Sequence, residues 1–205
     1  MSNDHYFTAN PQADLLTKSV SFEVAGETLT LTSSSGTFSS NRLDKGTSVL
    51  LQLADSFPEK GNVLDLGCGW GPIGISIAKL RPEVTVTGID VNQRSVELAN
   101  QNAQKLGLDN FKALLADNLP KESKFDEIWS NPPIRIGKSA LHELLEKHLG
   151  QLAPGGRAML VIQKQLGAKS LFEWLEEKYP SWKISKARND RGYWVIAVVS
   201  SPTHH

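Results

Sequence analysis

The chain has 205 residues, of which 40% are hydrophobic and 21% charged, a length that suits one α/β domain with a full core. Its 22 Lys and Arg residues equal its 22 Asp and Glu residues, so the totals do not predict a strongly basic nucleic-acid-binding protein. The sequence has neither the roughly 20 consecutive apolar residues of a membrane helix nor a signal peptide, and its one cysteine, Cys68, has no partner for an internal disulfide. We therefore expect a cytoplasmic protein without a membrane partner.

The first quarter of the chain predicts a small extension. Residues 1–16 are polar, show no period and are interpreted as a loosely docked arm. Between residues 20 and 31, apolar and polar residues alternate around a Gly-Glu turn, which predicts a β-hairpin. Asp44 is then a suitable N-cap for a helix that runs to about Ser56.

From Asn62 onward, short apolar runs alternate with amphipathic stretches. The apolar runs predict strands at 63–66, 84–89, 111–115, 125–129 and 158–162, and helical periodicity predicts helices at 72–80, 96–106, 141–152 and 170–178. Two further strands, 182–184 and 193–199, are expected to pair antiparallel. This order predicts a Rossmann-like α/β fold: a mostly parallel seven-stranded sheet with a terminal antiparallel hairpin, plus the N-terminal β-hairpin extension. We assign the sheet to a catalytic domain, residues 57–201, and treat residues 1–56 as an extension packed on it.

A glycine-rich loop from Asp65 to Gly71 follows the first strand of the predicted sheet. Glycines there permit positive φ and a close approach of the backbone to a ligand. The segment from Gly69 to Gly74 also fits the dinucleotide pattern Gly-x-Gly-x-x-Gly, which by itself is a weak signal. Asp65 lies inside the strand end, where a carboxylate opposes a pyrophosphate but suits a ligand carrying an ammonium and a sulfonium. The loop therefore favours S-adenosylmethionine over NAD.

Acidic residues follow the next two strands of the predicted sheet. Asp90 ends the second strand, 19 residues after Gly71, where a carboxylate can accept hydrogen bonds from both ribose hydroxyls of either cofactor. Asp117 follows the third strand and can accept a hydrogen bond from the amino group of adenine.

The segment Asn131-Pro132-Pro133 follows the fourth strand of the predicted sheet. Two consecutive prolines fix the backbone and remove two donors, while Asn131 adds a side-chain acceptor. Two acceptors at one rigid place can hold an amino group and orient its nitrogen toward an electrophilic methyl group. An NAD-dependent oxidoreductase needs the glycine loop but has no use for this segment. A non-catalytic RNA-binding module that keeps the fold is a third alternative.

The glycine loop, Asp90 and Asn131-Pro132-Pro133 together resemble the class I amino-directed S-adenosylmethionine-dependent methyltransferases. A longer set of stretches narrows this resemblance to the catalytic domain of small-subunit ribosomal RNA guanine-N2 methyltransferases, in their short, single-domain branch. These stretches are 36–39, 43–51, 63–69, 131–138 and 161–164.

This resemblance implies a role for each matching residue. The implied cofactor-binding residues are Asp65, Gly67, Cys68, Gly69, Gly71, Asp90, Val91, Asp117, Asn118 and Asn131. The implied catalytic residues around the target amino group are Asn131, Pro132, Pro133 and Ile134. The implied substrate is a guanine of ribosomal RNA, with a protein glutamine or an adenine as alternatives because the same motif serves those too. Many members carry an aromatic residue where this chain has Ile134, which cannot stack on a flipped base. Phe38 and Trp70 are alternative positions from which the base can be gripped.

Basic residues are expected to form a phosphate-binding edge beside the site. Arg135 and Lys138 follow the fourth strand, and Lys164 and Lys169 follow the fifth. Arg188 and Arg191 extend this edge if the terminal hairpin curls back. The predicted substrate-binding residues are Phe38, Arg135, Lys138 and Lys164.

No metal site is expected. His142 and His148 lie six residues apart on a predicted helix and do not share a face at ligand spacing. We expect a monomer that binds RNA.

Overall fold

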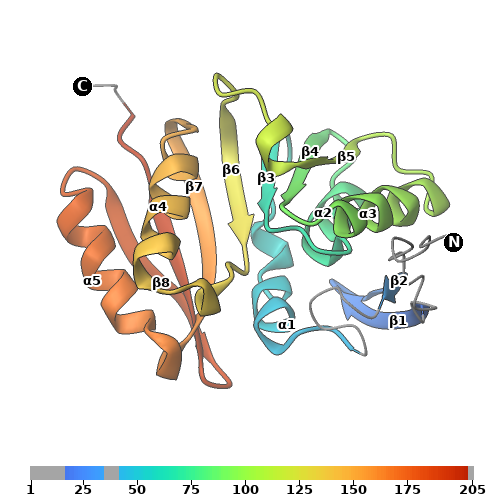
Figure 1. Cartoon of the computed structure of the whole chain (residues 1–205), viewed down its shortest axis with the longest axis horizontal. Helices are drawn as coiled ribbons and strands as arrows, with labels where there is room; N and C mark the ends of the chain where they lie inside the picture. The colour runs from blue at the N-terminus through green and yellow to red at the C-terminus, as the bar shows by residue number, and fades with distance from the viewer. Residues whose placement is uncertain (1–16, 35–41, 203–205) are drawn as a thin grey trace, which may run out of the picture.

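The computed structural model describes residues 17–34 and 42–202. Within them, a seven-stranded sheet carries helices on both faces, and a separate two-stranded hairpin lies beside the sheet (Figure 1). The predicted α/β fold class, with its N-terminal hairpin and antiparallel final strands, is confirmed.

The strands of the large sheet run in the order β5-β4-β3-β6-β7-β9-β8. Their bounds are β3 Gly61–Leu66, β4 Val84–Asp90, β5 Phe111–Leu115, β6 Phe125–Ser130, β7 Leu152–Gln163, β8 Lys183–Asp190 and β9 Tyr193–Val199. The first five strands in this order pair in parallel, and β9 pairs antiparallel with both β7 and β8. The chain order reverses between β3 and β6, and in open sheets of this kind ligands bind beyond the carboxyl ends of the strands at such a point.

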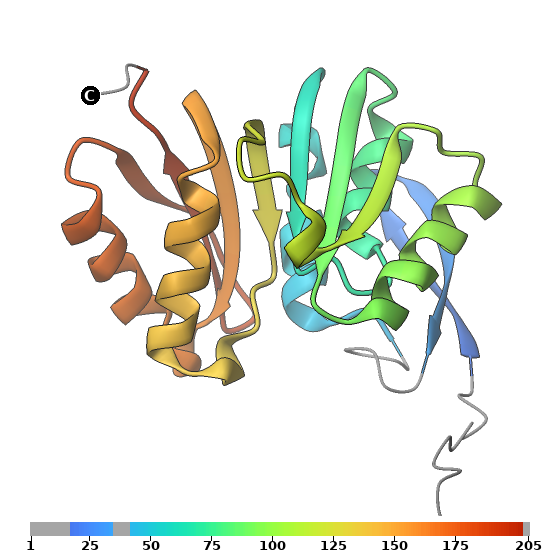
Figure 2. The ribbon, with the colours of Figure 1, turned by 45° about the horizontal axis from the view of Figure 1, so that its top comes forward.

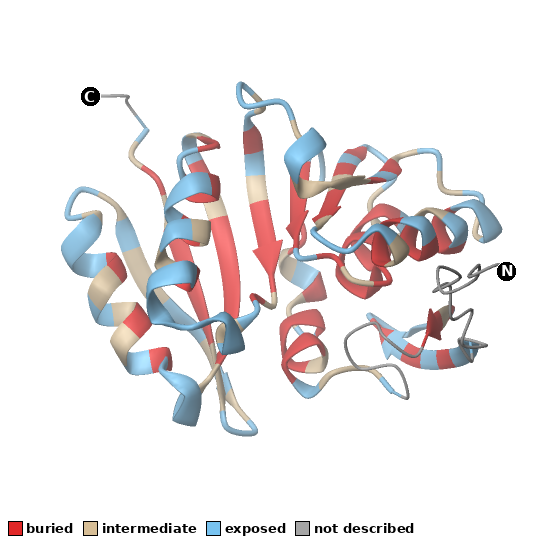
Figure 3. Cartoon of the chain, viewed as in Figure 1, coloured by how far each residue is buried: buried red, intermediate tan, exposed pale blue. Residues whose placement is uncertain are grey.

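Each face of the sheet carries its own set of helices. Their bounds are α1 Lys45–Leu51, α2 Pro72–Leu80, α3 Gln93–Lys105, α4 Lys138–Leu149 and α5 Ala168–Lys178. The apolar residues of α1, α2 and α3 belong to one buried cluster, and those of α4 and α5 belong to a second one across the sheet. Figure 3 shows a buried stripe on α3, α4 and α5, as expected for amphipathic helices that cover a sheet, whereas α2 is buried on nearly all sides.

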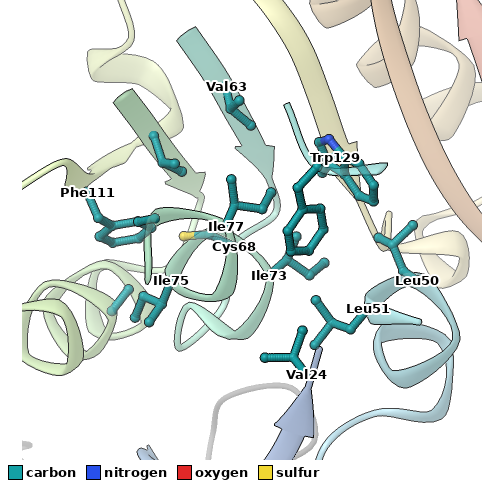
Figure 4. Close-up of a cluster of buried hydrophobic side chains, with 14 of the residues drawn as sticks. Val24, Leu50, Leu51, Val63, Cys68, Ile73, Ile75, Ile77, Phe111 and Trp129 are labelled. Atoms are coloured by element: carbon teal, nitrogen blue, oxygen red, sulfur yellow. The ribbon is translucent and has the colours of Figure 1, made fainter. Parts of the chain in front are cut away.

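The hairpin consists of β1 Thr17–Val24 and β2 Glu27–Ser34. Its two turn residues, Ala25 and Gly26, have φ values of 49° and 79°, the positive values that a tight two-residue hairpin turn requires. The hairpin lies apart from the large sheet, on the side of α3 (Figure 2). Its alternate apolar residues join the first cluster, so that Val24 lies near Leu51 and Ile73 (Figure 4). The hairpin thus shares a hydrophobic core with the sheet.

Three element boundaries differ from the prediction by the most residues. Leu152 begins β7 instead of ending α4, and the Pro-Gly-Gly segment after it is accommodated by a register shift against β6. The strand predicted at 182–184 extends to Asp190. None of the residues of β8 is buried and most are polar, so they gave no apolar pattern, because β8 is an edge strand. The helix predicted to reach Ser56 ends at Leu51 and is followed by a 3-10 turn before Pro58, a residue that disfavours helix on its N-terminal side.

Candidate active site

A cavity of about 530 Å³ lies at the carboxyl ends of the parallel strands, where the strand order reverses. Its volume falls within the range of roughly 300–1,000 Å³ that is typical of small-molecule sites. It brings together ten residues predicted from the sequence: Gly67, Cys68, Gly69, Asp90, Val91, Asn131, Pro132, Pro133, Ile134 and Arg135. Six other predicted residues are outside its lining: Asp65, Gly71, Asp117, Asn118, Lys138 and Lys164. Phe38 lies outside the described residues.

The glycine loop forms one wall of the cavity. Gly67 and Gly69 have φ values of 74° and 55°, and a Cβ atom added at either would meet no atom within 4 Å. The amides of Gly67 and Cys68 both donate to the carbonyl of Ile89 at 2.9 Å, which fixes the loop against β4. Burial raises the pKa of the Cys68 thiol well above its ordinary value, so the thiol stays protonated. The loop therefore offers bare backbone to a ligand.

Asp65 and Gly71 face away from the cavity. The Asp65 side chain is fully buried, and its Oδ2 atom accepts a hydrogen bond of 2.7 Å from the backbone N–H of Gly74 in α2. Burial raises the pKa of Asp65 from 3.8 to about 7, with a smaller contribution from the nearby Asp90. A Cβ atom on Gly71, where φ is 96°, would lie 2.6 Å from Cδ1 of Ile75. Both residues therefore fix the junction between the loop and α2.

Asp90 connects the glycine loop to the end of β4. Its Oδ2 atom accepts a 2.9 Å hydrogen bond from the N–H of Gly69, and its Oδ1 atom accepts another of 2.9 Å from the N–H of Asn92. Each carboxylate oxygen retains acceptor capacity for a further donor from the cavity. Next to it, Val91 lines the same cavity and is 87% exposed, which leaves an apolar surface for a ligand to cover.

The turn after β5 contributes fewer lining residues to the cavity than the sequence predicted. After β5 the chain forms a 3-10 turn, Ala116–Asn118, of which Ala116 lines the cavity while Asp117 and Asn118 are exposed.

The Asn131 side chain is held by the N-terminus of α1. Its Nδ2 atom donates to Oδ1 of Asp44 at 2.6 Å and to the hydroxyl of Thr47 at 3.1 Å. A carboxylate can only accept here, so this contact orients the amide with its nitrogen toward α1 and its oxygen away. No donor reaches the Asn131 Oδ1 atom from the described residues. Asn131 therefore presents an acceptor that none of residues 17–34 and 42–202 uses.

Sequence reasoning predicted that Asp44 caps a helix, and the backbone N–H of Thr47 does donate to Asp44 at 3.1 Å. It missed the second role of Asp44, the contact with Asn131, because the two residues are 87 positions apart. Gly46 makes this approach possible: a Cβ atom there would lie 3.1 Å from Oδ1 of Asp44 and 3.3 Å from Nδ2 of Asn131. Lining residues without a predicted role include Thr47, Asn92, Ser95, His148, Gln163, Leu166 and Tyr193.

A buried asparagine joins the hairpin to the glycine loop. Asn102 of α3 is 1% exposed, and its Oδ1 atom accepts from the N–H of Thr32 at 2.8 Å. Its Nδ2 atom donates to the carbonyls of Thr32 and Trp70, each at 2.9 Å. Since Trp70 lines the cavity, the position of the hairpin and the shape of the loop are mechanically linked.

The predicted basic residues lie around the rim. Arg135 lines the cavity, whereas Lys138 and Lys164 are exposed outside it. Lys169 lies 3.6 Å from Glu173, and Arg188 and Arg191 approach the same Asp190 at 3.8 and 3.5 Å, so two carboxylates face these three cations. Within the described ranges, no group of His, Cys, Asp and Glu residues is placed to hold a metal ion, and no helix is long and apolar enough to cross a membrane.

The strand order, the exposed backbone of the glycine loop, Asp90 and the Asn131-Pro132 segment at the point of reversal define a class I S-adenosylmethionine-dependent methyltransferase. Residues 28–197 match the family model of the methyltransferase small domain, and the chain belongs to this family. The predicted enzyme class and the predicted cofactor, S-adenosylmethionine, are thereby confirmed over NAD.

The chain is similar to the uncharacterized protein YbxB of Bacillus subtilis (strain 168), with 38% identity over 200 residues that cover 95% of this chain and 97% of that protein. It is also similar to ribosomal RNA small subunit methyltransferase C of Pseudomonas entomophila (strain L48), with 34% identity over 177 residues, 83% of this chain and 52% of that one. Among solved structures, it resembles the T. thermophilus 16S rRNA N2 methyltransferase RsmC in complex with AdoMet and guanosine. The TM-score is 0.76 at 25% identity, covering 94% of this chain and 52% of that one. The chain thus spans about half the length of the named ribosomal RNA methyltransferases.

Proposed function

We propose that this methyltransferase modifies the exocyclic amino group of a guanine in ribosomal RNA. The observation that carries the proposal is the Asn131 amide, whose nitrogen is held by Asp44 and Thr47 and whose oxygen accepts no hydrogen bond from the described ranges. An acceptor fixed in this way can bind one hydrogen of an amino group, and the carbonyl of Pro132 can bind the other. Two similar proteins are named as ribosomal RNA methyltransferases, one of them solved with guanosine, which supports this substrate.

The cofactor half of the cavity fits S-adenosylmethionine. The bare backbone at Gly67 and Gly69 leaves room for the methionine part, Asp90 can accept from the ribose hydroxyls, and Val91 can cover the adenine. Asp117 and Asn118 would reach the adenine from the turn after β5. When bound, the cofactor supplies a methyl group on a positively charged sulfur.

The protein's contribution to the chemistry is mainly positioning. Asn131 and Pro132 hold the amino group, and Pro133 and Ile134 shape the backbone beside it. The amino nitrogen loses its proton as it becomes positively charged, so no strongly basic side chain is required at that atom.

The rim is proposed to bind the RNA backbone through Arg135, Lys138 and Lys164. The two 3-10 turns that carry Arg135 and Lys164 also present two apolar side chains, Ile136 and Leu166, which are 49% and 47% exposed. Affinity for ribosomal RNA should fall with rising salt. In a plot of the logarithm of the binding constant against the logarithm of the salt concentration, the Arg135→Ala, Lys138→Ala double variant should reduce the slope by about two. A slope that is flat in the wild type would contradict an RNA substrate gripped at this rim.

The decisive experiment is mass spectrometry of nucleosides from small-subunit ribosomal RNA after incubation with the protein and isotope-labelled S-adenosylmethionine. We expect label in N2-methylguanosine, loss of label with Asn131→Ala, and unchanged labelling with Asn62→Ala, an exposed asparagine in β3 that does not line the cavity. Labelled methyladenosine would instead identify adenine as the substrate, and label on a protein glutamine would identify glutamine, the two alternatives that an Asn-Pro-Pro segment also serves. Full labelling by Asn131→Ala would show that Asn131 does not hold the amino group.

A further inference from the structure

Two side chains on neighbouring antiparallel strands line the cavity beyond Asn131. Gln163 ends β7, Tyr193 begins β9, and the two residues are direct partners in the ladder. Direct partners of an antiparallel pair present their side chains on the same face, next to each other. Both line the cavity, so the amide and the phenol ring form one continuous surface there.

This surface lies on the side of Asn131 that faces away from the glycine loop. In the sheet order, β6 is followed by β7 and then by β9, whereas β3 and β4 with the cofactor loop lie on the other side of β6. Gly46 shows how near the ring is: a Cβ atom there would lie 3.1 Å from Cε1 of Tyr193 and 3.3 Å from Nδ2 of Asn131. The ring and the amide that is proposed to hold the amino group therefore pack against the same glycine.

The polar groups of this surface are free of hydrogen bonds to the part of the chain that the structure describes. No hydrogen bond from the described residues reaches the side-chain amide of Gln163 or the hydroxyl of Tyr193. Burial, and then the nearby Asp44, raise the pKa of Tyr193, so the phenol remains neutral and able to donate. The surface thus combines one aromatic face with two free hydrogen-bonding groups.

These are the properties that recognition of an unstacked nucleobase requires: an aromatic face for stacking and side-chain groups for the base edge. Ile134, which follows the Pro-Pro segment, offers an aliphatic side chain that cannot stack in this way. We infer that Tyr193 stacks on the target base and that Gln163 bonds to its Watson–Crick edge, so the aromatic contact comes from β9 and not from the position after the prolines. This inference rests on the proposed function and adds the residues that determine the base.

The test compares Tyr193→Leu with Tyr193→Phe, and Gln163→Leu with Gln101→Leu, an exposed glutamine of α3 away from the cavity. Three quantities are measured: kcat/KM for ribosomal RNA, the calorimetric affinity for S-adenosylhomocysteine, and the Tm. Tyr193→Leu should lower kcat/KM by about tenfold, in line with the loss of one stacking contact, while Tyr193→Phe keeps the ring and stays within about threefold. Gln163→Leu should also lower kcat/KM, and Gln101→Leu should not. Cofactor affinity and Tm should be nearly unchanged in all four.

The outcomes separate the two ideas. If the wild type forms N2-methylguanosine but Tyr193→Leu retains wild-type kcat/KM, the base-binding surface is refuted and the proposed function stands. If cofactor affinity falls in parallel with activity, these residues shape the whole cavity and the inference is also refuted. If the wild type forms no methylguanosine, the proposed function fails and the inference fails with it.

Discussion

Replacing Asn102 with alanine should weaken both the fold and cofactor binding, although this residue does not line the cavity. The change removes the three hydrogen bonds that Asn102 makes with the backbone of Thr32 and with the carbonyl of Trp70. Thr32 is half-buried, so water can form hydrogen bonds to its backbone in place of Asn102. Each of the two bonds between Asn102 and Thr32 therefore contributes only roughly 1 kcal/mol to the free energy of unfolding. The bond to the Trp70 carbonyl is buried, where the loss of a hydrogen bond costs roughly 1–3 kcal/mol.

Together these losses predict a decrease of about 3–5 kcal/mol in the free energy of unfolding, and a Tm about 10 °C lower for a chain of this size. The release of Trp70 should also affect the ligand. If the glycine loop then keeps its native form only a tenth of the time, the apparent Kd for S-adenosylhomocysteine rises about tenfold.

Asn100→Ala is a matched control on the same helix. Asn100 makes two hydrogen bonds to the backbone of Ala113 in the edge strand β5 and none to the glycine loop. It should lose about 2 kcal/mol of stability and keep its affinity for S-adenosylhomocysteine. Urea unfolding with an unchanged m-value and calorimetry at a temperature where all variants are folded measure both effects. If Asn102→Ala binds the ligand as tightly as Asn100→Ala does, the proposed link between hairpin and loop is wrong.

Three further predictions concern the loop and Asn131. Because folding raises the pKa of Asp65 from 3.8 to about 7, the carboxyl group is protonated in the folded state and ionised in the unfolded state between these two pH values. Stability of the ligand-free protein should therefore fall by roughly 4 kcal/mol as pH rises through this window, and urea titrations of Asp65→Asn should show a flatter profile. Asp44→Ser keeps a helix cap but loses the carboxylate bonded to Asn131, so kcat should fall by about 10- to 100-fold with unchanged stability; an unaltered kcat would disprove the orienting role. Gly67→Ala and Gly107→Ala both place a methyl group in open space at positive φ, so each should lower the free energy of unfolding by about 1–2 kcal/mol. Of the two positions only Gly67 lines the cavity, so calorimetry should find weaker cofactor binding for Gly67→Ala and not for Gly107→Ala.

The fold was largely predictable because its parallel strands are buried on both faces and read as apolar runs. The edge strand β8 was mostly missed for the opposite reason: none of its residues is buried, so nothing in its sequence marks a buried face. Loop positions after strands were also predictable, since the carboxyl ends of parallel strands meet at one edge of the sheet. Asp90 and Asn131 therefore lie in one cavity, as expected.

What escaped prediction depends on contacts between distant parts of the chain. The bond between Asn131 and Thr47 joins residues 84 positions apart, and the pairing of Gln163 with Tyr193 depends on β9 lying beside β7. Asp65 shows a different limit. Its position in the strand end was correctly located, but alternation along a strand does not reveal which face a ligand occupies, and the side chain lies under α2. Its part in cofactor binding stays a prediction.

The position of β9 has a consequence for how the protein folds. β9 lies between β7 and β8, both of which precede it in the chain, and β8 pairs with no other strand among the described residues. During synthesis, β7 therefore emerges with an open edge and β8 without a partner, until β9 leaves the ribosome and enters the gap between them. The pairing of β9 with β7 is non-local and therefore slow relative to the local β8–β9 hairpin. Because Tyr193 is the first residue of β9, closing the sheet and completing the wall of the cavity become the same event, and a chain that has not finished folding has no intact site.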